Sequence, residues 1–284
     1  MARQLRIEYP GAVYHVTSRG NAQQDIYTAD SDRRQFLDLL ASTVKRFNWL
    51  CHAYCLMDNH FHLLIETVDP NLSRGMRHLN SVYSQRFNRQ HSRVGHVFQG
   101  RFKSIIVEKE SHLLELCRYI ILNPVAAKIV THPEDYRWSS YRFTARSIKK
   151  PGFLSIDWVL GQFADKMLPA RKRYRDFVAE GIDNPPEQPW KNLVGQIILG
   201  GDAFVSQIQE LFSEKKQIKE IPRIQRYSGR PLLEDLFISQ NTRNKQERNK
   251  LISTACFLHG YSMKEISDCL GIHYSTVSRI LKDS

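Results

Sequence analysis

The sequence lacks the features that would place it in a membrane or in an oxidising compartment. No apolar run approaches the ~20 residues that a membrane-spanning helix needs, and the first residues carry no apolar core of a signal peptide. The five cysteines are odd in number and form no Cys-x-x-Cys pair, which argues against a disulfide framework and against a structural zinc site. We therefore expect a cytoplasmic protein with reduced thiols.

Acidic residues are scarce relative to basic ones. The 284 residues include 41 Lys and Arg against 29 Asp and Glu, a net charge of +12 with histidines neutral. Such an excess favours a polyanionic partner, with nucleic acid ahead of an anionic membrane surface. The imbalance is concentrated in residues 71–103, which contain no Asp or Glu. The predicted nucleic-acid contacts in this segment are Arg74, Arg77, Arg86, Arg89, Arg93, Arg101 and Lys103.

Four aromatic residues are interleaved with these cations: Tyr83, Phe87, Phe98 and Phe102. Arginines can hold phosphates while aromatic rings stack on bases, a combination typical of proteins that bind single-stranded or distorted nucleic acid. We therefore predict that the segment contacts nucleic acid. The alternative is a solvated helix face with a few aromatic residues in the core.

Hydrophobic periodicity predicts an α+β domain followed by an all-helical one. Strand and helix signals alternate in an order that favours an antiparallel sheet with helices packed on it. The predicted strands are 14–18, 49–56, 61–68 and 102–108, and the predicted helices are 30–47, 72–89 and 110–122. Breaks rich in Pro and Gly then divide the chain. We predict a sheet domain at 1–148, a connector with a short helix at 149–189, and a helical domain at 190–284.

Two residue pairs are candidates for chemistry. His60 and His62 lie two apart where the predicted strand 61–68 begins; in extended backbone both imidazoles leave the same face and could supply two ligands to a metal. Tyr119 and Asn123 share a face of a predicted helix. A phenol beside a metal-bound phosphate can attack phosphorus, and an amide oxygen suits a divalent cation. On these residues alone the alternatives stay open: two hydrogen-bonded sheet histidines, and an asparagine that ends its helix before Pro124.

Four longer motifs contain these residues. They read Tyr14-His15-Val16-Thr17-Ser18-Arg19-Gly20-Asn21, Met57-Asp58-Asn59-His60-Phe61-His62-Leu63-Leu64, Gly95-His96-Val97-Phe98-Gln99-Gly100-Arg101-Phe102-Lys103 and Tyr119-Ile120-Ile121-Leu122-Asn123-Pro124-Val125. In this order they resemble the single-tyrosine HUH transposases, and among them most closely the REP-associated tyrosine transposases. The resemblance covers roughly residues 5–145. It implies a ferredoxin-like HUH nuclease domain that acts on single-stranded DNA, often beside a hairpin.

The resemblance also assigns roles. It implies that His60 and His62 are metal ligands, that Asn123 completes the protein set, and that Tyr119 is the nucleophile. The implied products are a 5′-phosphotyrosine and a free 3′-hydroxyl, and attack by another 3′-hydroxyl transfers the strand. The implied ion is Mg²⁺ or Mn²⁺, whereas the imidazoles alone would suggest a softer metal such as zinc. His15 could face this site from the first strand, and we expect it to be a bystander.

Residues 260–282 have the layout of a helix-turn-helix. Apolar positions repeat at helical spacing on both sides of Gly271, which supplies the turn. The outward residues of the second helix are short polar or basic, as a major-groove reader requires: Tyr274, Ser275, Thr276, Ser278, Arg279 and Lys282. We predict a second DNA-binding surface here, and the alternative is a helical hairpin used for protein contacts. Typical compact transposases of this family lack such an extension.

We therefore expect a metal-dependent tyrosine transposase that cleaves and rejoins single-stranded, hairpin-bearing DNA and carries an added duplex reader. The alternative, from another class of protein, is a domesticated DNA-binding regulator with an idle nuclease centre. The expected partner is DNA and not a membrane, and the expected location is the bacterial nucleoid. The tyrosine can act on its own chain's site or on a partner's, so a homodimer stays open.

Overall fold

The structure, a computed structural model, describes residues 6–184, 193–211, 230–238 and 245–282. Their contacts divide the chain into two compact units. The sheet unit comprises residues 6–193 and 197–204, and the helical unit comprises residues 205–284 with 194–196 and 1–5. The α+β class predicted from the sequence is confirmed, with additional helices near the C-terminus.

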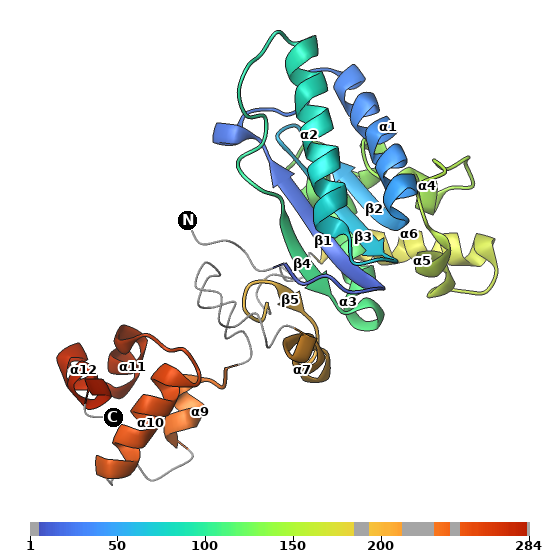
Figure 1. The fold of residues 1–284 in the computed structure, drawn as a ribbon. Helices are drawn as coiled ribbons and strands as arrows, with labels where there is room; N and C mark the ends of the chain where they lie inside the picture. Colours follow the sequence, from blue (N-terminus) through green and yellow to red (C-terminus); the bar gives the residue numbers. More distant parts are fainter. Residues whose placement is uncertain (1–5, 185–192, 212–229, 239–244, 283–284) are drawn as a thin grey trace. The chain divides into compact units, whose positions relative to one another are not determined.

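The sheet unit is organised around a five-stranded sheet of order β2-β3-β1-β4-β5 (Figure 1). The strands are β1 (Ala12–Arg19), β2 (Trp49–Leu56), β3 (His60–Thr67), β4 (Lys103–Val107) and β5 (Ile198–Leu199). The central strand β1 runs antiparallel to both β3 and β4, and β2 runs antiparallel to β3. The predicted antiparallel arrangement therefore holds for the first four strands.

The expectation of an entirely helical segment after Trp190 is wrong at β5. Ile198 and Leu199 pair with Ile106 and Val107, and this pairing is parallel, so the sheet is mixed. Both residues of β5 are buried against the sheet unit. A strand of two residues is too short to show the alternation by which a sequence reveals a strand.

Helices cover both faces of the sheet (Figure 1). On one face α1 (Asp30–Phe47) and α2 (Leu72–Gln90) pack against each other, and on the other lies α3 (Lys109–Ala126). Successive side chains of β3 point to opposite faces of the sheet. Phe61 contacts Phe36 of α1, whereas the next residue, His62, meets Tyr119 of α3. The histidine face of β3 is thus the face that α3 covers.

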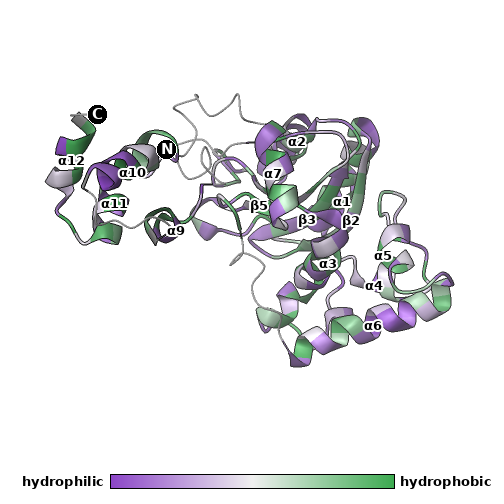
Figure 2. Cartoon of the chain, turned by 90° about the horizontal axis from the view of Figure 1, so that it is seen from below, coloured by the Kyte–Doolittle hydropathy of each residue, from purple (hydrophilic) through white to green (hydrophobic). Residues whose placement is uncertain are grey.

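Further helices extend the layer of α3. They are α4 (Tyr141–Ala145), α5 (Asp157–Gly161) and α6 (Met167–Asp183), with short 3₁₀ turns at Asn21–Gln23 and Pro133–Asp135. α6 packs on α3, α4 and α5, and hydrophilic and hydrophobic residues alternate in bands along it (Figure 2). The segment predicted as a connector therefore contributes α5 and α6 to the sheet unit, whereas residues 185–189 of that segment lie outside the described residues. No helix in the described part of the chain is long and apolar enough to cross a bilayer.

The expectation that Asn123-Pro124 ends a helix is wrong, because α3 continues to Ala126 with Pro124 inside it. Proline has no backbone N–H, so the carbonyl of Ile120 loses its usual donor. The Asn123 side chain compensates: its Nδ2 donates to the carbonyl oxygen of Tyr119 at 2.8 Å and to that of Ile120 at 3.4 Å. These two hydrogen bonds engage the amide nitrogen of Asn123, and neither of them involves its amide oxygen.

Among its described residues, the helical unit contains most of α7 (Asp202–Leu211) and four further helices. The four are α9 (Leu233–Ile238), α10 (Lys245–Phe257), α11 (Met263–Leu270) and α12 (Tyr274–Lys282). Their buried core consists of Phe237, Ile252, Ala255, Tyr261, Ile266 and Val277. This core is small, so hydrogen bonds at the helix ends also help to fix where the helices of the unit begin and end.

Both ends of α11 carry such signals. The hydroxyl of Ser262 accepts from the Glu265 N–H at 3.1 Å, and the Glu265 carboxylate accepts from the Ser262 N–H at 2.7 Å, which is a capping box. The helix ends at Gly271, whose φ of 62° favours a residue without a side chain. The predicted turn residue is therefore also the residue that ends α11.

Candidate active site

Antiparallel pairing of β1 with β3 brings three histidines to one face of the sheet. His60 and His62 of β3 face α3, and the register places Arg19 opposite His60 and Thr17 opposite His62. Because residues two apart on a strand share a face, His15 of β1 also points to this side, diagonal to His62.

Tyr119 of α3 meets these rings edge-on. Its ring centroid lies 6.0 Å from that of His62 and 6.3 Å from that of His15, at interplanar angles of 81° and 90°. The His60 ring lies 4.9 Å from the His62 ring. Asn123 is half-buried one helical turn beyond Tyr119. The structure thus brings the phenol and both imidazoles of the predicted site together from segments far apart in the sequence.

Burial keeps the imidazoles neutral. It lowers the pKa of His15 to about 3, and it lowers the pKa of His62 well below the ordinary value, with His15 and His60 adding to the effect. Burial and the charge of Arg19 lower the pKa of His60, and Asp58 opposes them. A neutral imidazole is the form that binds a metal ion, because its lone pair is free of a proton.

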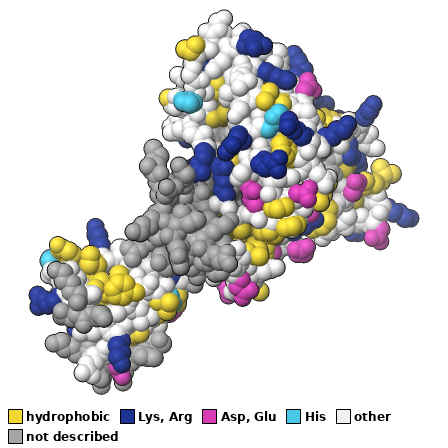
Figure 3. All heavy atoms as spheres, viewed as in Figure 1, with side chains coloured by type: hydrophobic (Ala, Val, Ile, Leu, Met, Phe, Trp, Pro, Cys, Tyr) yellow, Lys and Arg dark blue, Asp and Glu magenta, His cyan; other side chains and the backbone are white. Residues whose placement is uncertain are grey.

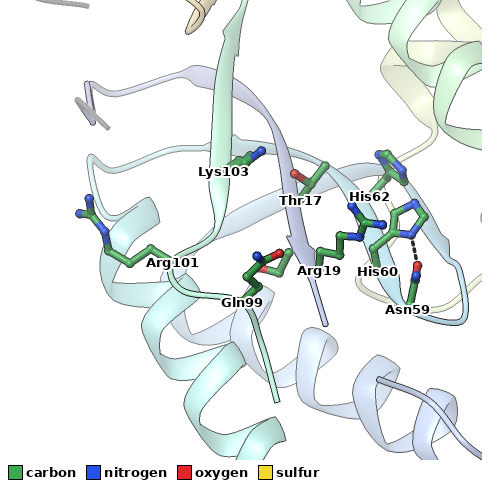
Figure 4. A pocket seen from close by; sticks show the side chains of 9 residues that line it. Thr17, Arg19, Asn59, His60, His62, Gln99, Arg101 and Lys103 are labelled. Atoms are coloured by element: carbon green, nitrogen blue, oxygen red, sulfur yellow. Dashed lines mark hydrogen bonds between the residues drawn. The ribbon is translucent and has the colours of Figure 1, made fainter. Parts of the chain in front are cut away.

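Two ring nitrogens are suited to hold a cation. Nδ1 of His60 lies 2.7 Å from Oδ1 of Asn59, so that the ring donates its proton there and carries the lone pair on Nε2 (Figure 4). Nε2 of His62 is buried and has no hydrogen-bond partner among the described residues. A buried polar atom left in that state costs free energy, and a cation would satisfy it. Asn123, one turn along α3 from Tyr119, carries an amide oxygen, which is a hard donor of the kind that suits Mg²⁺ or Mn²⁺.

The protein ligands are few. Among the residues that the structure describes, no three His, Cys, Asp or Glu side chains form a group that could hold a metal ion. A cation bound here would therefore complete its coordination with an amide oxygen, water or substrate. Such partial sets are usual where a metal ion also binds phosphate.

A cavity of about 320 Å³, lined by polar and charged residues, opens beside the two histidines of β3 (Figure 4). Its lining residues are Thr17, Ser18, Arg19, Asn59, His60, His62, Gln99, Arg101 and Lys103. The lining includes Arg101 and Lys103, which the sequence predicted as nucleic-acid contacts. It also includes Arg19, Asn59 and Gln99, which sequence reasoning missed. Their positions depend on strand register, and the only signal for Arg19 was its even spacing from His15 along β1.

The remaining cations of the predicted segment lie on another layer. Four of them are exposed on α2, which covers the opposite face of the sheet from α3: Arg74, Arg77, Arg86 and Arg89. Figure 3 shows Lys and Arg side chains gathered over this part of the sheet unit. Arg93 follows α2 and donates to Oε1 of Gln24 at 2.8 Å. The cations thus divide into a cavity group and an α2 group.

Arg6 lies near both groups. Its guanidinium stacks 3.7 Å from the centroid of the Phe102 ring. The pKa of Arg6 is lowered to about 10, mainly by burial and also by repulsion from Arg101 and Arg77, while Glu8 opposes these effects. Cations held this close together repel one another, and a bound polyanion would relieve that repulsion.

The prediction that the interleaved aromatic residues stack on bases is wrong. Tyr83 and Phe87 are fully buried, and Phe98 and Phe102 are 7% and 5% exposed. The Tyr83 ring packs against Phe36 at 5.2 Å. On α2 the aromatic residues follow helical spacing on the inner face and the arginines occupy the outer face, so the alternative of core aromatic residues is the correct one.

In the helical unit, the predicted outward residues of α12 are accessible. Tyr274, Ser275 and Arg279 are exposed, and Thr276 and Ser278 are half-buried. The side chain of Lys282 lies outside the described residues. Their role stays a prediction.

Comparison with known proteins places the site in a family. Residues 9–123 match a family described as "Transposase IS200 like". Over these residues the chain is similar to IS200-like transposases, and we refer to them below as the transposase domain. The transposase domain includes His15, His60, His62 and Tyr119 and extends to Asn123, and the match confirms the resemblance that the motifs indicate.

Two further comparisons bear on the transposase domain. A solved structure, described as a REP-associated tyrosine transposase bound to a REP hairpin, is similar over 56% of this chain and 91% of its own, with 17% identity and a TM-score of 0.45. A search of curated proteins found no significant match. The family supports a transposase-like activity on DNA.

Proposed function

We propose that the transposase domain cuts and rejoins single-stranded DNA through a covalent bond between Tyr119 and a 5′-phosphate. The observation that carries the proposal is the meeting of the Tyr119 ring with the ring of His62, which in turn meets that of His60, and both histidines line a cavity together with three cations. A phenol, two neutral imidazoles and arginines are what nucleophilic attack on a phosphodiester requires.

The chemistry balances without an external energy source. The phenolic oxygen of Tyr119 attacks phosphorus and loses its proton, and the bond from phosphorus to the 3′-oxygen breaks. The leaving 3′-oxygen takes up a proton, which leaves a 5′-phosphotyrosine and a 3′-hydroxyl. Attack by a 3′-hydroxyl from another strand end reverses these steps and regenerates Tyr119. One phosphodiester is thereby exchanged for another.

His60 and His62, through Nε2, and Asn123, through Oδ1, would hold Mg²⁺ or Mn²⁺. Bound there, the ion would neutralise phosphate charge and align the scissile bond for in-line attack. The neutral state of both imidazoles and the unpartnered Nε2 of His62 support this assignment. The amide nitrogen of Asn123 is engaged by the helix carbonyls, which leaves its oxygen for the ion.

The DNA strand would enter through the cavity. Arg19, Arg101 and Lys103 line it and would hold the phosphates that flank the scissile bond. The exposed arginines of α2 cover the other face of the sheet, so they would serve a different stretch of the same substrate. A hairpin next to the cleavage site, as the motif resemblance implies, supplies that stretch.

The helical unit would provide a second DNA surface. The exposed face of α12 carries Arg279 among short polar side chains, and α11 and α12 are joined at Gly271. We propose that this face reads duplex DNA and contributes to target choice. The proposed division of labour is cleavage in the sheet unit and duplex binding in the helical unit.

The test is a covalent adduct assay with the full chain. Labelled hairpin-bearing single-stranded DNA is incubated with the protein and Mn²⁺, and the products are separated on a denaturing gel. Wild type should form an adduct, and Tyr119→Phe should lower its yield by at least ~10³-fold because no nucleophilic oxygen remains. Binding of the same DNA should change less than about twofold, because hydrogen bonding by one hydroxyl contributes little to a phosphate-dominated affinity.

Tyr9→Phe is the matched control, since Tyr9 is a half-buried tyrosine that precedes β1 in the same unit, whereas Tyr119 is the tyrosine whose ring meets His15 and His62. It should form the adduct as wild type does. An adduct with Tyr119→Phe would show that another residue is the nucleophile. A wild-type protein that binds hairpin DNA but forms no adduct with any hairpin tested would favour a DNA-binding regulator with an idle centre.

A further inference from the structure

Arg6 is a half-buried cation that has only neutral hydrogen-bond partners. Its guanidinium lies over the Phe102 ring and donates to the carbonyl oxygen of Phe102 at 3.3 Å and to the hydroxyl of Ser73 at 3.4 Å, both long for such bonds. The carboxylate of Glu8 accepts instead from the Ser73 N–H at 2.7 Å. Among the described residues Arg6 forms no ion pair. A partly desolvated charge without a counter-charge is costly, so Arg6 is suited to an anion from outside the chain.

Two further arginines lie beside the contacts of Arg6. Arg101 directly precedes Phe102, and Arg77 lies one turn along α2 from Ser73, on the same face of that helix. Both arginines are exposed, and the charge of each repels that of Arg6. The contacts of Arg6 with α2 and with the residue before β4 thus gather three guanidinium groups in one neighbourhood.

This neighbourhood joins the two groups of cations described above. Arg101 lines the cavity of the candidate active site, and Figure 4 shows its side chain extending away from His60 and His62. Arg77 belongs to the exposed cations of α2, on the other face of the sheet. Arg6 therefore links the cavity group and the α2 group into one row of positive charge.

We propose that Arg6, Arg77 and Arg101 form a phosphate-binding site that guides a DNA strand from the cavity onto the exposed face of α2. The inference rests on the proposed function for the presence of a strand in the cavity, and it adds the route by which that strand continues. A phosphate among the three guanidinium groups supplies the negative charge that Arg6 lacks. The cavity and α2 then bind one continuous strand, whereas without this junction they bind two separate segments.

The first test compares short and long DNA. Fluorescence anisotropy measures the affinity of the full chain, carrying Tyr119→Phe and without metal so that no strand is cut, for oligothymidylates of about 5 and about 20 nucleotides. Arg6→Met keeps an unbranched side chain on Phe102 but removes the charge. It should weaken binding of the long strand about tenfold and reduce its salt slope by about 0.7, and it should change binding of the short strand less than about twofold.

Two variants control for charge and for folding. Arg6→Lys keeps the positive charge and should bind the long strand within about threefold of the unmodified site. Arg173→Met removes an exposed arginine of α6 that also donates to a backbone carbonyl, that of Phe163 at 2.7 Å, and should leave both affinities unchanged. If Arg6→Met did not fold, Arg77→Met would decide, because this exposed side chain should show the same dependence on strand length.

The second test asks whether two arginines hold the same phosphate. Because they share it, the loss in Arg6→Met with Arg101→Met should be at least about threefold smaller than the product of the two single losses. Arg89, in the last turn of α2, is the control partner, and its loss should multiply with that of Arg6. Independent losses for Arg6 and Arg101 would contradict a shared site.

These results are separable from the proposed chemistry. Equal weakening of short and long strands by Arg6→Met, or unchanged binding of the long strand, would overturn the route even if wild type forms the covalent adduct. A wild type that forms no adduct, together with the expected dependence on strand length, would refute the tyrosine chemistry and leave the route in place. Absence of binding to either strand would overturn both.

Discussion

The candidate functional groups of the sheet unit are buried, whereas those of the helical unit are exposed. In the sheet unit the polar groups that matter most are interior: His15 and His62 are 2% and 6% exposed, and of these two His62 lines the cavity. In the helical unit a small apolar core supports a polar face, and Arg279 and its neighbours are exposed. Chemistry on a phosphodiester benefits from groups held in a dry, rigid setting, whereas reading a duplex requires side chains that reach outwards.

The largest change in stability should come from replacing a buried carboxylate of the sheet unit. Asp32, at the start of α1, accepts hydrogen bonds from the backbone N–H groups of Thr28 and Ala29, from the Thr28 hydroxyl and from His91. Burial opposes its ionisation, but the bonds from His91, Thr28 and Ala29 outweigh burial and lower the pKa of its carboxyl. Asp32→Asn should therefore lower the free energy of unfolding of the sheet unit by about 1–3 kcal/mol at pH 7.

The pH dependence gives the sign of the Asp32 effect. Because its pKa is lower in the folded state, Asp32 stabilises the fold above its ordinary pKa, and that contribution is lost as the pH falls through the folded-state value. Wild type and Asp32→Asn should thus converge in acid. Three of the four tryptophans, Trp49, Trp138 and Trp158, are described residues of the sheet unit, so urea unfolding followed by tryptophan fluorescence reports chiefly on this unit. Equal stability at pH 7, or a gap that widens in acid, would contradict the assignment.

A smaller effect should come from the surface of the helical unit. Arg279→Ala should weaken duplex affinity by about tenfold, because one arginine contact to a base edge contributes about 1–3 kcal/mol. The yield of the covalent adduct on single-stranded hairpin DNA should not change. The measurement is a titration of labelled duplex selected from a random library, followed by fluorescence anisotropy.

Lys264→Ala is the matched control for charge, since Lys264 is an exposed cation on α11 outside the proposed reading face. It should cost less than about threefold in affinity. If both variants weakened binding equally, the helical unit would bind DNA only through its net charge. If Arg279→Ala lowered the adduct yield, the proposed division of labour would be wrong.

Much of this arrangement could be predicted from local pattern. The sequence located β2 and β3 to within one residue, and the two-residue spacing of His60 and His62 placed them on one face without knowledge of their neighbours. Helical spacing likewise located α1, α2 and α12. The motif resemblance then connected the histidines with Tyr119, a link that no local pattern contains.

The rest depends on contacts between distant segments. The partner of His62 on β1 is decided by the register of two strands, and a shift of one residue would turn His15 away. The continuation of α3 through Pro124 depends on where the Asn123 amide donates. Alternating aromatic and basic residues on α2 gave a misleading signal, because the same spacing serves a helix with one buried and one exposed face.

The central claim is that His60 and His62 share one cation within reach of Tyr119. It is tested most directly by anomalous diffraction from crystals of the protein grown with Mn²⁺ and a single-stranded oligonucleotide. We predict one strong Mn²⁺ peak at ligand distance from Nε2 of both histidines, with the Tyr119 hydroxyl facing a phosphate on that ion. A peak bound elsewhere, or a Tyr119 hydroxyl directed away from the phosphate, would contradict the account.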